Sequence, residues 1–420
     1  MSNLTEEFSR YLLKKSEAIG EETTKKAASC VADYTAVAQA GARKNLARWN
    51  ELVDLLPAGK ARLFGFEKRV SGKDAALING FNAHALELDD GQRFAMIHLG
   101  ASVISALSAA RDETGFSDEA MLRGVIMGYE AACRAAICMQ PSHKNRGYHA
   151  AGTCGTIGCA AAVAFALGFD ESKLKRALTL AAAGAQGLLE IQEQGSELKP
   201  YNVGRAAMDG LAAAYTALAD FETPDDMLGG ERGFFRSVSD EYDETKLTQE
   251  TDYFEIGRIY VKPYASCRHS HSAVEAAIRL HGKFDPADVL SADVRTYKLG
   301  VKGHDHTDIR GVASAKLSTP YAVAAALLYG RADLSVFEPL DVKIVALAQK
   351  IGVREDAQLT KESPQKRVAV VSVTLKDGTV LSERVDYAKG DPENPMSEEE
   401  LKQKIIQLSK YENRQERKTL

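Results

Sequence analysis

Apolar residues recur at helical spacing through most of the first 250 residues, without the alternation of a half-buried strand. Ser117, followed by two acids, supplies a cap and an acidic first turn for one of the helices. The pattern predicts helices at Glu6–Ile19, Glu22–Leu55, Lys73–Leu88, Ala101–Thr114, Asp118–Cys138, Gly152–Leu167, Glu171–Leu189 and Val203–Phe221.

The pattern changes after about residue 250, where β-branched and aromatic residues alternate in short runs. Strands are predicted at Tyr253–Val261, Val289–Leu299, Arg367–Leu375 and Thr379–Asp386, the last two joined by a turn at Asp377-Gly378. Helices are predicted at Ser272–His281, Pro320–Leu328 and Val336–Lys350, with Thr319 as a cap, and a last helix follows Ser397. This organisation predicts a mainly α protein. Residues 1–255 with 395–420 would form a large all-α domain, and residues 256–394 a smaller α+β domain.

The segment Ala150–Phe169 has no charged residue and is long enough to span a bilayer. It consists mostly of Ala, Gly, Thr and Cys, which favour close helix packing more than contact with lipid. A buried central helix is therefore favoured over a membrane span. No strand precedes its glycines, so they are not a dinucleotide-binding fingerprint.

The composition is that of an ordinary soluble protein, with 26% charged and 45% hydrophobic residues. A formal charge of −5 gives no basic footprint for nucleic acid or an anionic membrane. The six cysteines lack zinc or disulfide spacing and indicate a reducing compartment. The charged N-terminal helix lacks the apolar core of a signal peptide. We therefore expect a cytoplasmic protein.

One polar stretch between two predicted helices concentrates acids and imidazoles. It contains His84, Glu87, Asp89, Asp90 and, after a loop, His98. Short acids followed by glycine favour a helix end and a turn. Acids and imidazoles at such a junction can place proton donors and acceptors on one wall of a cleft. The alternative is a solvated helix end with one structural histidine.

Two further polar groups precede predicted helices. His149 stands directly before the uncharged segment, where a helix N-terminus lowers the pKa of an imidazole and attracts anions. Lys199 and Arg205 flank a turn that contains Pro200, at the start of the helix predicted at Val203–Phe221, and form a candidate carboxylate clamp. A capping histidine and two solvated cations are the alternatives.

The segment 262–271, KPYASCRHSH, follows a predicted strand and contains Lys262, Cys267, Arg268, His269 and His271. Two histidines without supporting ligands nearby argue against a metal site. Basic neighbours can lower the pKa of Cys267, but no Cys-His-Asn pattern accompanies it.

Tyr321 places a phenol in the first turn of the predicted helix after Thr319, where a half-buried amphipathic side chain is the alternative. Phosphate loops and nucleic-acid motifs are absent from the sequence. A set of histidine, lysine, arginine and tyrosine suits a small polyanionic acid whose proton is moved without a cofactor.

The order of these motifs resembles the MmgE/PrpD family. The motifs are HALELDD (84–90), HLG (98–100), GYH (147–149), GSELK (195–199), KPYASCRHSH (262–271), STPYAVA (318–324) and GDPENP (390–395). The family includes 2-methylcitrate dehydratase, cis-aconitate decarboxylase and iminodisuccinate epimerase. The chain departs from the family pattern in having Glu87 in place of Asp and Gly91 in place of Thr.

The resemblance implies a large all-α domain made from both chain ends, an α+β lid domain and an active site between them. It also implies a homodimer that uses no metal and no organic cofactor. The family's active-site positions fall on Glu87, His98, His149, Lys199, Lys262 and Tyr321, with His269 or His271 as a further position.

We therefore expect a lyase of the dehydratase type that acts beside a carboxylate of a small di- or tricarboxylic acid. Lys199, Lys262 and Arg268 would hold carboxylates, with His271 as a further substrate-binding residue. His98 or His149 would take the α-proton, and the other histidine or Tyr321 would donate one, with Glu87 in the catalytic set. A decarboxylase, an epimerase and a non-enzymatic organic-anion binding protein are the alternatives.

Overall fold

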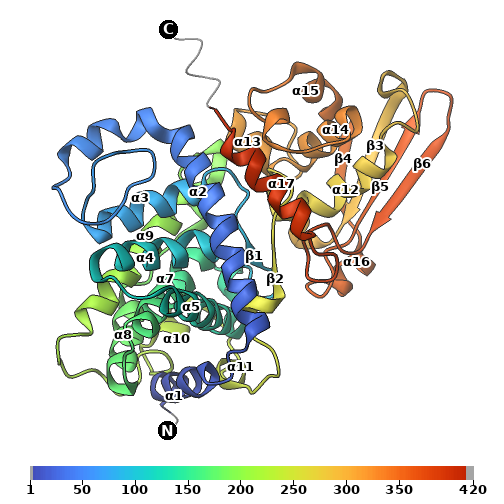
Figure 1. The fold of residues 1–420 in the computed structure, drawn as a ribbon. Coiled ribbons are helices and arrows are strands. Elements are labelled where there is room, and N and C mark those ends of the chain that lie inside the picture. Colours follow the sequence, from blue (N-terminus) through green and yellow to red (C-terminus); the bar gives the residue numbers. More distant parts are fainter. Residues whose placement is uncertain (1–2, 413–420) are drawn as a thin grey trace.

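The computed structural model describes residues 3–412 as a large helical part beside a smaller part built on a sheet (Figure 1). This arrangement confirms the predicted mainly α fold. The helices of the large part are α1 (Leu4–Ser16), α2 (Glu21–Leu55), α3 (Gly72–His84), α4 (Gly100–Thr114), α5 (Asp118–Met139), α6 (Ser142–Asn145), α7 (Ala150–Ala166), α8 (Glu171–Gly184), α9 (Lys199–Thr216), α10 (Phe234–Val238) and α11 (Thr245–Thr248).

Helix α7, the uncharged segment, lies in the centre of the helical part with every residue buried. It packs against α5 and α9. The approach to α5 depends on glycine, because a Cβ atom at Gly158 would lie 2.6 Å from the Cβ atom of Ala132. The prediction of a buried central helix is confirmed. Across residues 3–412, no helix is long and apolar enough to cross a membrane.

The smaller part, called the lid below, contains a four-stranded sheet in the order β4-β3-β5-β6. Strand β3 pairs parallel with β4 and antiparallel with β5, and β5 and β6 form a hairpin whose turn contains Gly378 at φ 89°. Helices α12 and α14 pack on the sheet. The bounds are β3 (Val289–Thr296), β4 (Ile351–Glu355), β5 (Ala369–Leu375), β6 (Val380–Val385), α12 (His271–Leu280), α13 (Val312–Leu317), α14 (Thr319–Tyr329), α15 (Val342–Ala348) and α16 (Ala357–Glu362).

The predicted strand Tyr253–Val261 is wrong. Its middle forms a 3-10 helix, η2 (Glu255–Arg258), and only β2 (Ile259–Tyr260) is assigned as a strand. Strand β2 pairs with β1 (Gly91–Gln92), which the sequence pattern did not indicate. The other 3-10 helices are η1 (Leu189–Gly195), η3 (Arg268–Ser270), η4 (Pro286–Asp288), η5 (Lys298–Gly300) and η6 (Leu334–Val336).

Several helix ends differ from the predicted ones: α8 and α9 each end five residues early, and the helix predicted at Val336–Lys350 is α15, Val342–Ala348. Three other differences lie near the polar residues singled out above. Helix α3 ends at His84, four residues early, and α9 begins at Lys199, four residues before its predicted start. The cap of α14 is Ser318, whose hydroxyl accepts from the Tyr321 backbone N–H, rather than Thr319. The early end of α3 leaves Glu87 and Asp89 in the segment after the helix, and the early start of α9 makes Lys199 its first residue.

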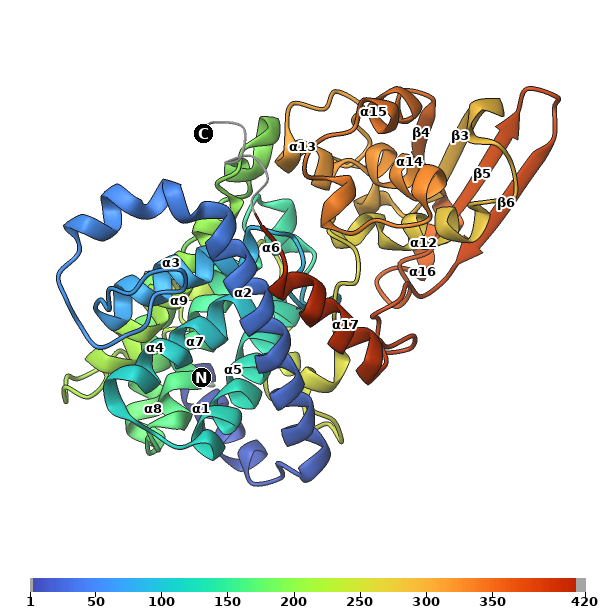
Figure 2. The same cartoon turned by 45° about the horizontal axis from the view of Figure 1, so that its top comes forward.

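The last helix, α17 (Glu398–Ser409), crosses beside α2 and next to the lid (Figures 1 and 2). Lys404 Nζ lies 2.6 Å from Asp33 Oδ1 of α2 and donates to the backbone carbonyl of Leu88 at 2.9 Å. Leu408 belongs to the hydrophobic core of the lid. Because α17 contacts both parts, the assignment of residues 395–420 to the helical domain stays a prediction, and residues 413–420 lie outside the described residues.

Candidate active site

Glu87 occupies the point where the chain leaves α3, with a backbone φ of 55° that non-glycine residues seldom adopt. Its buried carboxylate meets two ammonium groups. Lys262 Nζ lies 2.8 Å from Oε2, and Lys199 Nζ, from the first residue of α9, pairs with Oε1. Lys262 follows β2 at the base of the lid, so this cluster ties three distant segments together.

Burial alone raises the pKa of Glu87, but the neighbouring charges of Lys199 and Lys262 outweigh it and hold the pKa well below its ordinary value. The carboxylate is therefore ionised at neutral pH. The sequence predicted Lys199 and Lys262 as substrate clamps and Glu87 as a catalytic residue. In the structure, the single carboxylate of Glu87 pairs with both lysines, which leaves a net positive charge, and Lys262 is fully buried.

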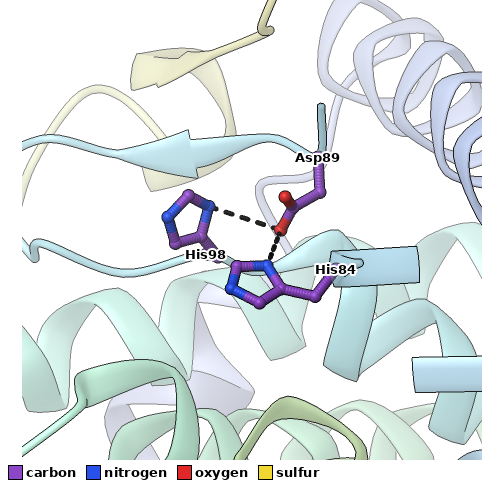
Figure 3. Close-up of side chains that lie close together, drawn as sticks. All are labelled: His84, Asp89 and His98. Carbon is purple, nitrogen blue, oxygen red and sulfur yellow. Dashed lines mark hydrogen bonds and ion pairs between the residues drawn. The ribbon is translucent and has the colours of Figure 1, made fainter. Parts of the chain in front are cut away.

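Asp89 joins two imidazoles on the wall next to this cluster. His84 Nδ1 lies 2.7 Å from Asp89 Oδ2, and His98 Nδ1 lies 3.3 Å from the same oxygen (Figure 3). The His84 and His98 ring centroids are 4.8 Å apart. His84 Nε2 is buried and has no hydrogen-bond partner among residues 3–412. The predicted meeting of acids and imidazoles at this junction is present.

The surroundings of His98 determine its tautomer. Nδ1 lies 2.9 Å from the backbone carbonyl of Asp90 as well as near Asp89 Oδ2, and both neighbours are acceptors, so Nδ1 carries the proton. Nε2 is then a free lone pair. Burial lowers the pKa of His98 to about 4, against the opposing effect of Asp89. His98 is thus a neutral imidazole at neutral pH.

His149 has the opposite tautomer. The side-chain amide of Asn202 donates to the backbone carbonyl of Leu188 at 3.1 Å, which identifies its nitrogen, and the same nitrogen lies 3.3 Å from His149 Nδ1. Nδ1 therefore accepts, and Nε2 carries the proton. Burial and the positive charge of Lys199 hold the pKa of His149 well below its ordinary value.

A pocket between the helical part and the lid has both rings in its wall. The space not filled by protein atoms is about 660 Å³, part of which is open to solvent. We call it the central pocket, and its lining residues are Met96, His98, Gln140, Lys144, Tyr148, His149, Ala150, Leu189, Gln192, Lys199, Tyr260, Cys267, Arg268, His269, His304, Leu317 and Arg367. The lining holds four cationic side chains and four histidines, but no carboxylate. Such a pocket attracts small polyanions.

Two predicted substrate-binding residues, Arg268 and His271, make their polar contacts within the protein. Arg268 lines the central pocket, but its Nη2 lies 2.7 Å from Asp391 Oδ1 in a buried ion pair. His271 Nδ1 lies 2.9 Å from Arg268 Nη1, and its Nε2 lies 3.1 Å from the Ser266 carbonyl, so neither nitrogen is free for a substrate. These contacts make His271 a support for Arg268 rather than a substrate-binding residue.

The structure does not bring Tyr321 to the central pocket. Its ring is fully buried in the core of the lid, 5.5 Å between centroids from Phe337, and its hydroxyl donates to the Val336 carbonyl at 2.9 Å. The assignment of a proton donor to Tyr321 is therefore corrected. Arg205 likewise pairs with Asp209, at 2.9 Å on the same helix, and does not line the pocket.

Sequence reasoning missed Lys144, His304 and Arg367. Lys144 lies in the one-turn helix α6, and Arg367 precedes β5, so neither stands in a motif that indicates chemistry. His304 Nε2 lies 3.8 Å from Cys267 Sγ, and its Nδ1 lies 3.0 Å from the Leu317 carbonyl. A search for histidines able to face Cys267 could have suggested His304. The two residues are 37 positions apart, so no short sequence motif joins them.

Cys267 and His304 form a polarised pair in the pocket wall. Burial alone raises the pKa of the Cys267 thiol, but His304 outweighs it and lowers this pKa to about 6. In return, Cys267 raises the pKa of His304 above its ordinary value against the effect of burial. Cys267 is therefore mainly a thiolate at neutral pH, and its charge favours the protonated form of His304.

Among residues 3–412, the metal-ligating atoms of His84, Asp89 and His98 lie within 4.8 Å of one another. As it stands, the cluster does not fit a metal ion. The Nδ1 atoms of both rings face Asp89 as hydrogen-bond donors, and Lys262 Nζ lies 3.9 Å from Asp89 Oδ1, where it repels a second cation.

Comparison with known proteins places the whole chain in one family. The MmgE/PrpD N-terminal domain model matches residues 6–246, and the MmgE/PrpD C-terminal domain model matches residues 264–420. The cis-aconitate decarboxylase of Aspergillus terreus is 24% identical over 425 residues, covering 93% of this chain and 86% of that protein. The cis-aconitate decarboxylase of Mus musculus is 26% identical over 354 residues, covering 79% and 70%.

A shorter match links the chain to a second enzyme name. The 2-methylcitrate dehydratase of Cupriavidus necator is 35% identical over 136 residues, covering 29% of this chain and 28% of that protein. Together with the two domain models and the ordered motifs, these matches show that the chain belongs to the MmgE/PrpD family.

Proposed function

We propose that the protein is a cofactor-independent lyase of the dehydratase type, acting on the carbon beside a carboxylate of a small di- or tricarboxylic acid. One observation carries the proposal. A pocket lined by four cations and no carboxylate presents two neutral imidazoles, one with a bare nitrogen and one with an N–H. Cations bind and polarise the carboxylate, and a neutral imidazole can accept the proton.

In the proposed reaction, His98 Nε2 removes the α-proton. The electron pair left on carbon spreads into the adjacent carboxylate, and Lys199 together with His149 Nε2–H stabilises this enediolate-like charge. The carbon–oxygen bond at the β-carbon then breaks as the double bond forms. His98 returns the proton to the leaving hydroxyl, which departs as water. Glu87 and Asp89 act as positioning residues for Lys199 and His98.

A decarboxylase is the second candidate, because the relatives matched over 79% and 93% of this chain are cis-aconitate decarboxylases. Here the carbon–carbon bond to one carboxylate breaks, carbon dioxide leaves, and the resulting carbanion takes a proton. An epimerase would return a proton to the opposite face of the same enediolate. A non-enzymatic organic-anion binding protein would use the cations without the imidazoles.

A panel of di- and tricarboxylates in heavy water, followed by NMR, tests the proposal. A dehydratase should yield an unsaturated acid and place deuterium at the α-carbon of recovered substrate, since the abstracted proton exchanges with solvent. Release of carbon dioxide identifies the decarboxylase, and inversion without loss of mass identifies the epimerase. Binding with neither exchange nor turnover across the panel would contradict an enzymatic role.

We also propose a cytoplasmic homodimer, as the family resemblance implies. Size-exclusion chromatography with light scattering should give a mass near twice the 45.5 kDa of the chain. A monomer at micromolar concentration would contradict the dimer.

A further inference from the structure

Lys144 and Arg367 are the two cations of the central pocket without an acid partner. Lys199 is paired with Glu87, and Arg268 with Asp391. Among residues 3–412, neither Lys144 nor Arg367 forms an ion pair with a carboxylate within 4.0 Å. Arg367 is buried and Lys144 is half-buried. Burial lowers the pKa of Lys144, and the two charges are close enough that Arg367 lowers it as well. Two neighbouring cations that form no ion pair of their own favour an anion bound from outside the protein.

The contacts of these two cations are neutral groups or backbone. Lys144 Nζ lies 3.4 Å from His269 Nε2, and the other ring nitrogen of His269 lies 2.6 Å from the hydroxyl of Tyr297. Arg367 Nη2 donates to the Arg93 carbonyl at 3.2 Å, and its guanidinium lies 5.7 Å from the Tyr260 ring centroid. These contacts orient both cations, and both side chains line the central pocket.

Lys144 comes from the helical part, and Arg367 comes from the lid. We infer that they form a second carboxylate subsite, distinct from the one at Lys199, and that a ligand must bring an additional carboxylate to bridge the two parts of the protein. This inference rests on the proposed function and assigns the distal carboxylate of its di- or tricarboxylic substrate to these two residues. Monocarboxylates and esters of that distal group would be poor substrates.

Isothermal titration of unreactive acids tests the subsite without turnover. Glutarate should bind the wild-type protein more tightly than butyrate, which has one carboxylate fewer. Lys144→Met and Arg367→Gln should each weaken binding of glutarate about tenfold or more and should remove most of its advantage over butyrate. Exposed Lys60 provides a control, since Lys60→Met removes the same charge outside the pocket and should leave both affinities unchanged.

The two variants should also be non-additive, since both cations hold one carboxylate and the first loss already frees it. Arg367→Lys, which keeps the charge, should bind with intermediate affinity and guards against a misfolded Arg367→Gln. If all pocket variants are folded and retain the wild-type preference for glutarate over butyrate, the subsite does not exist. If binding follows these expectations while the substrate panel shows no chemistry, the subsite stands and the proposed reaction fails.

Discussion

The carboxylate of Asp89 lies 3.3 Å from Nδ1 of His98 and helps hold that nitrogen as a donor, so the other nitrogen is bare at the central pocket. A second acceptor, the Asp90 carbonyl, acts in the same direction. The tautomer of the proposed base is thus determined by residues eight and nine positions away. This relationship distinguishes the roles of two histidines that sequence motifs treat alike.

His98→Gln should lower kcat by roughly two to four orders of magnitude, because glutamine cannot accept the α-proton. Asp89→Asn should cost less, about ten- to hundredfold, because a neutral amide still accepts a hydrogen bond but orients and charges the ring less well. Asp89 also opposes the lowering of the His98 pKa, so NMR titration of Asp89→Asn should show a still lower His98 pKa. Near-native turnover of folded His98→Gln would remove His98 from catalysis.

Lys199→Ala should lower kcat and raise KM together, because a cation next to developing negative charge binds the transition state more strongly than the ground state. We expect a loss of about tenfold to a thousandfold in kcat. Arg205→Ala is the matched control, since Arg205 lies six residues further along the same helix and pairs with Asp209 outside the pocket. A rise in KM alone would make Lys199 a uniform binder.

The low pKa of His98, about 4, predicts that this ring stays neutral from pH 7 down to about pH 5. An exposed histidine would become half protonated near pH 6.5. Because the unfolded chain binds the proton first, this group destabilises the fold as pH falls from about 6.5 toward 4, by at most about 1.4 kcal/mol per pH unit. Urea unfolding across this range should show a shallower pH dependence in His98→Gln. An equal dependence in both proteins would contradict the shift.

Cys267 should be alkylated by iodoacetamide much faster than the other five cysteines, all of which are buried. Its rate should rise with pH through a midpoint near 6, where the thiolate forms. His304→Asn should move that midpoint upward, because the imidazolium no longer stabilises the thiolate. Mass spectrometry of the individual cysteine peptides measures the rates. A midpoint near 8.5 in the wild-type protein would show that the pair is not ionised.

Activity should survive exhaustive chelation, because the Nδ1 atoms of His84 and His98 both face Asp89 as hydrogen-bond donors and Lys262 lies beside the same carboxylate. Elemental analysis of the purified protein, with turnover measured before and after treatment, tests this. Stoichiometric zinc or iron whose removal abolishes turnover would contradict a cofactor-independent reaction.

The sequence by itself determined the helical architecture and the region of the site. Helical periodicity, caps and turn residues are local signals, and local backbone preferences follow them wherever packing agrees, as in α5 and the hairpin between β5 and β6. The ordered motifs also placed His98, His149 and Lys199, which the structure brings to one pocket. The predicted end of α3 was wrong, because the apolar periodicity continues to Leu88 although the helix ends at His84 and Glu87 adopts a left-handed backbone conformation.

Only the tertiary structure decided which of these side chains are free to act. Lys262 and Arg268 form ion pairs with Glu87 and Asp391, partners more than 100 residues away, and Tyr321 is buried in the core of the lid. Lys144 and Arg367 stand in no motif and meet only when the helical part and the lid assemble. The charge and tautomer of a group depend on the sum of burial and neighbouring charges, and the folded chain supplies those neighbours from segments that sequence spacing does not relate.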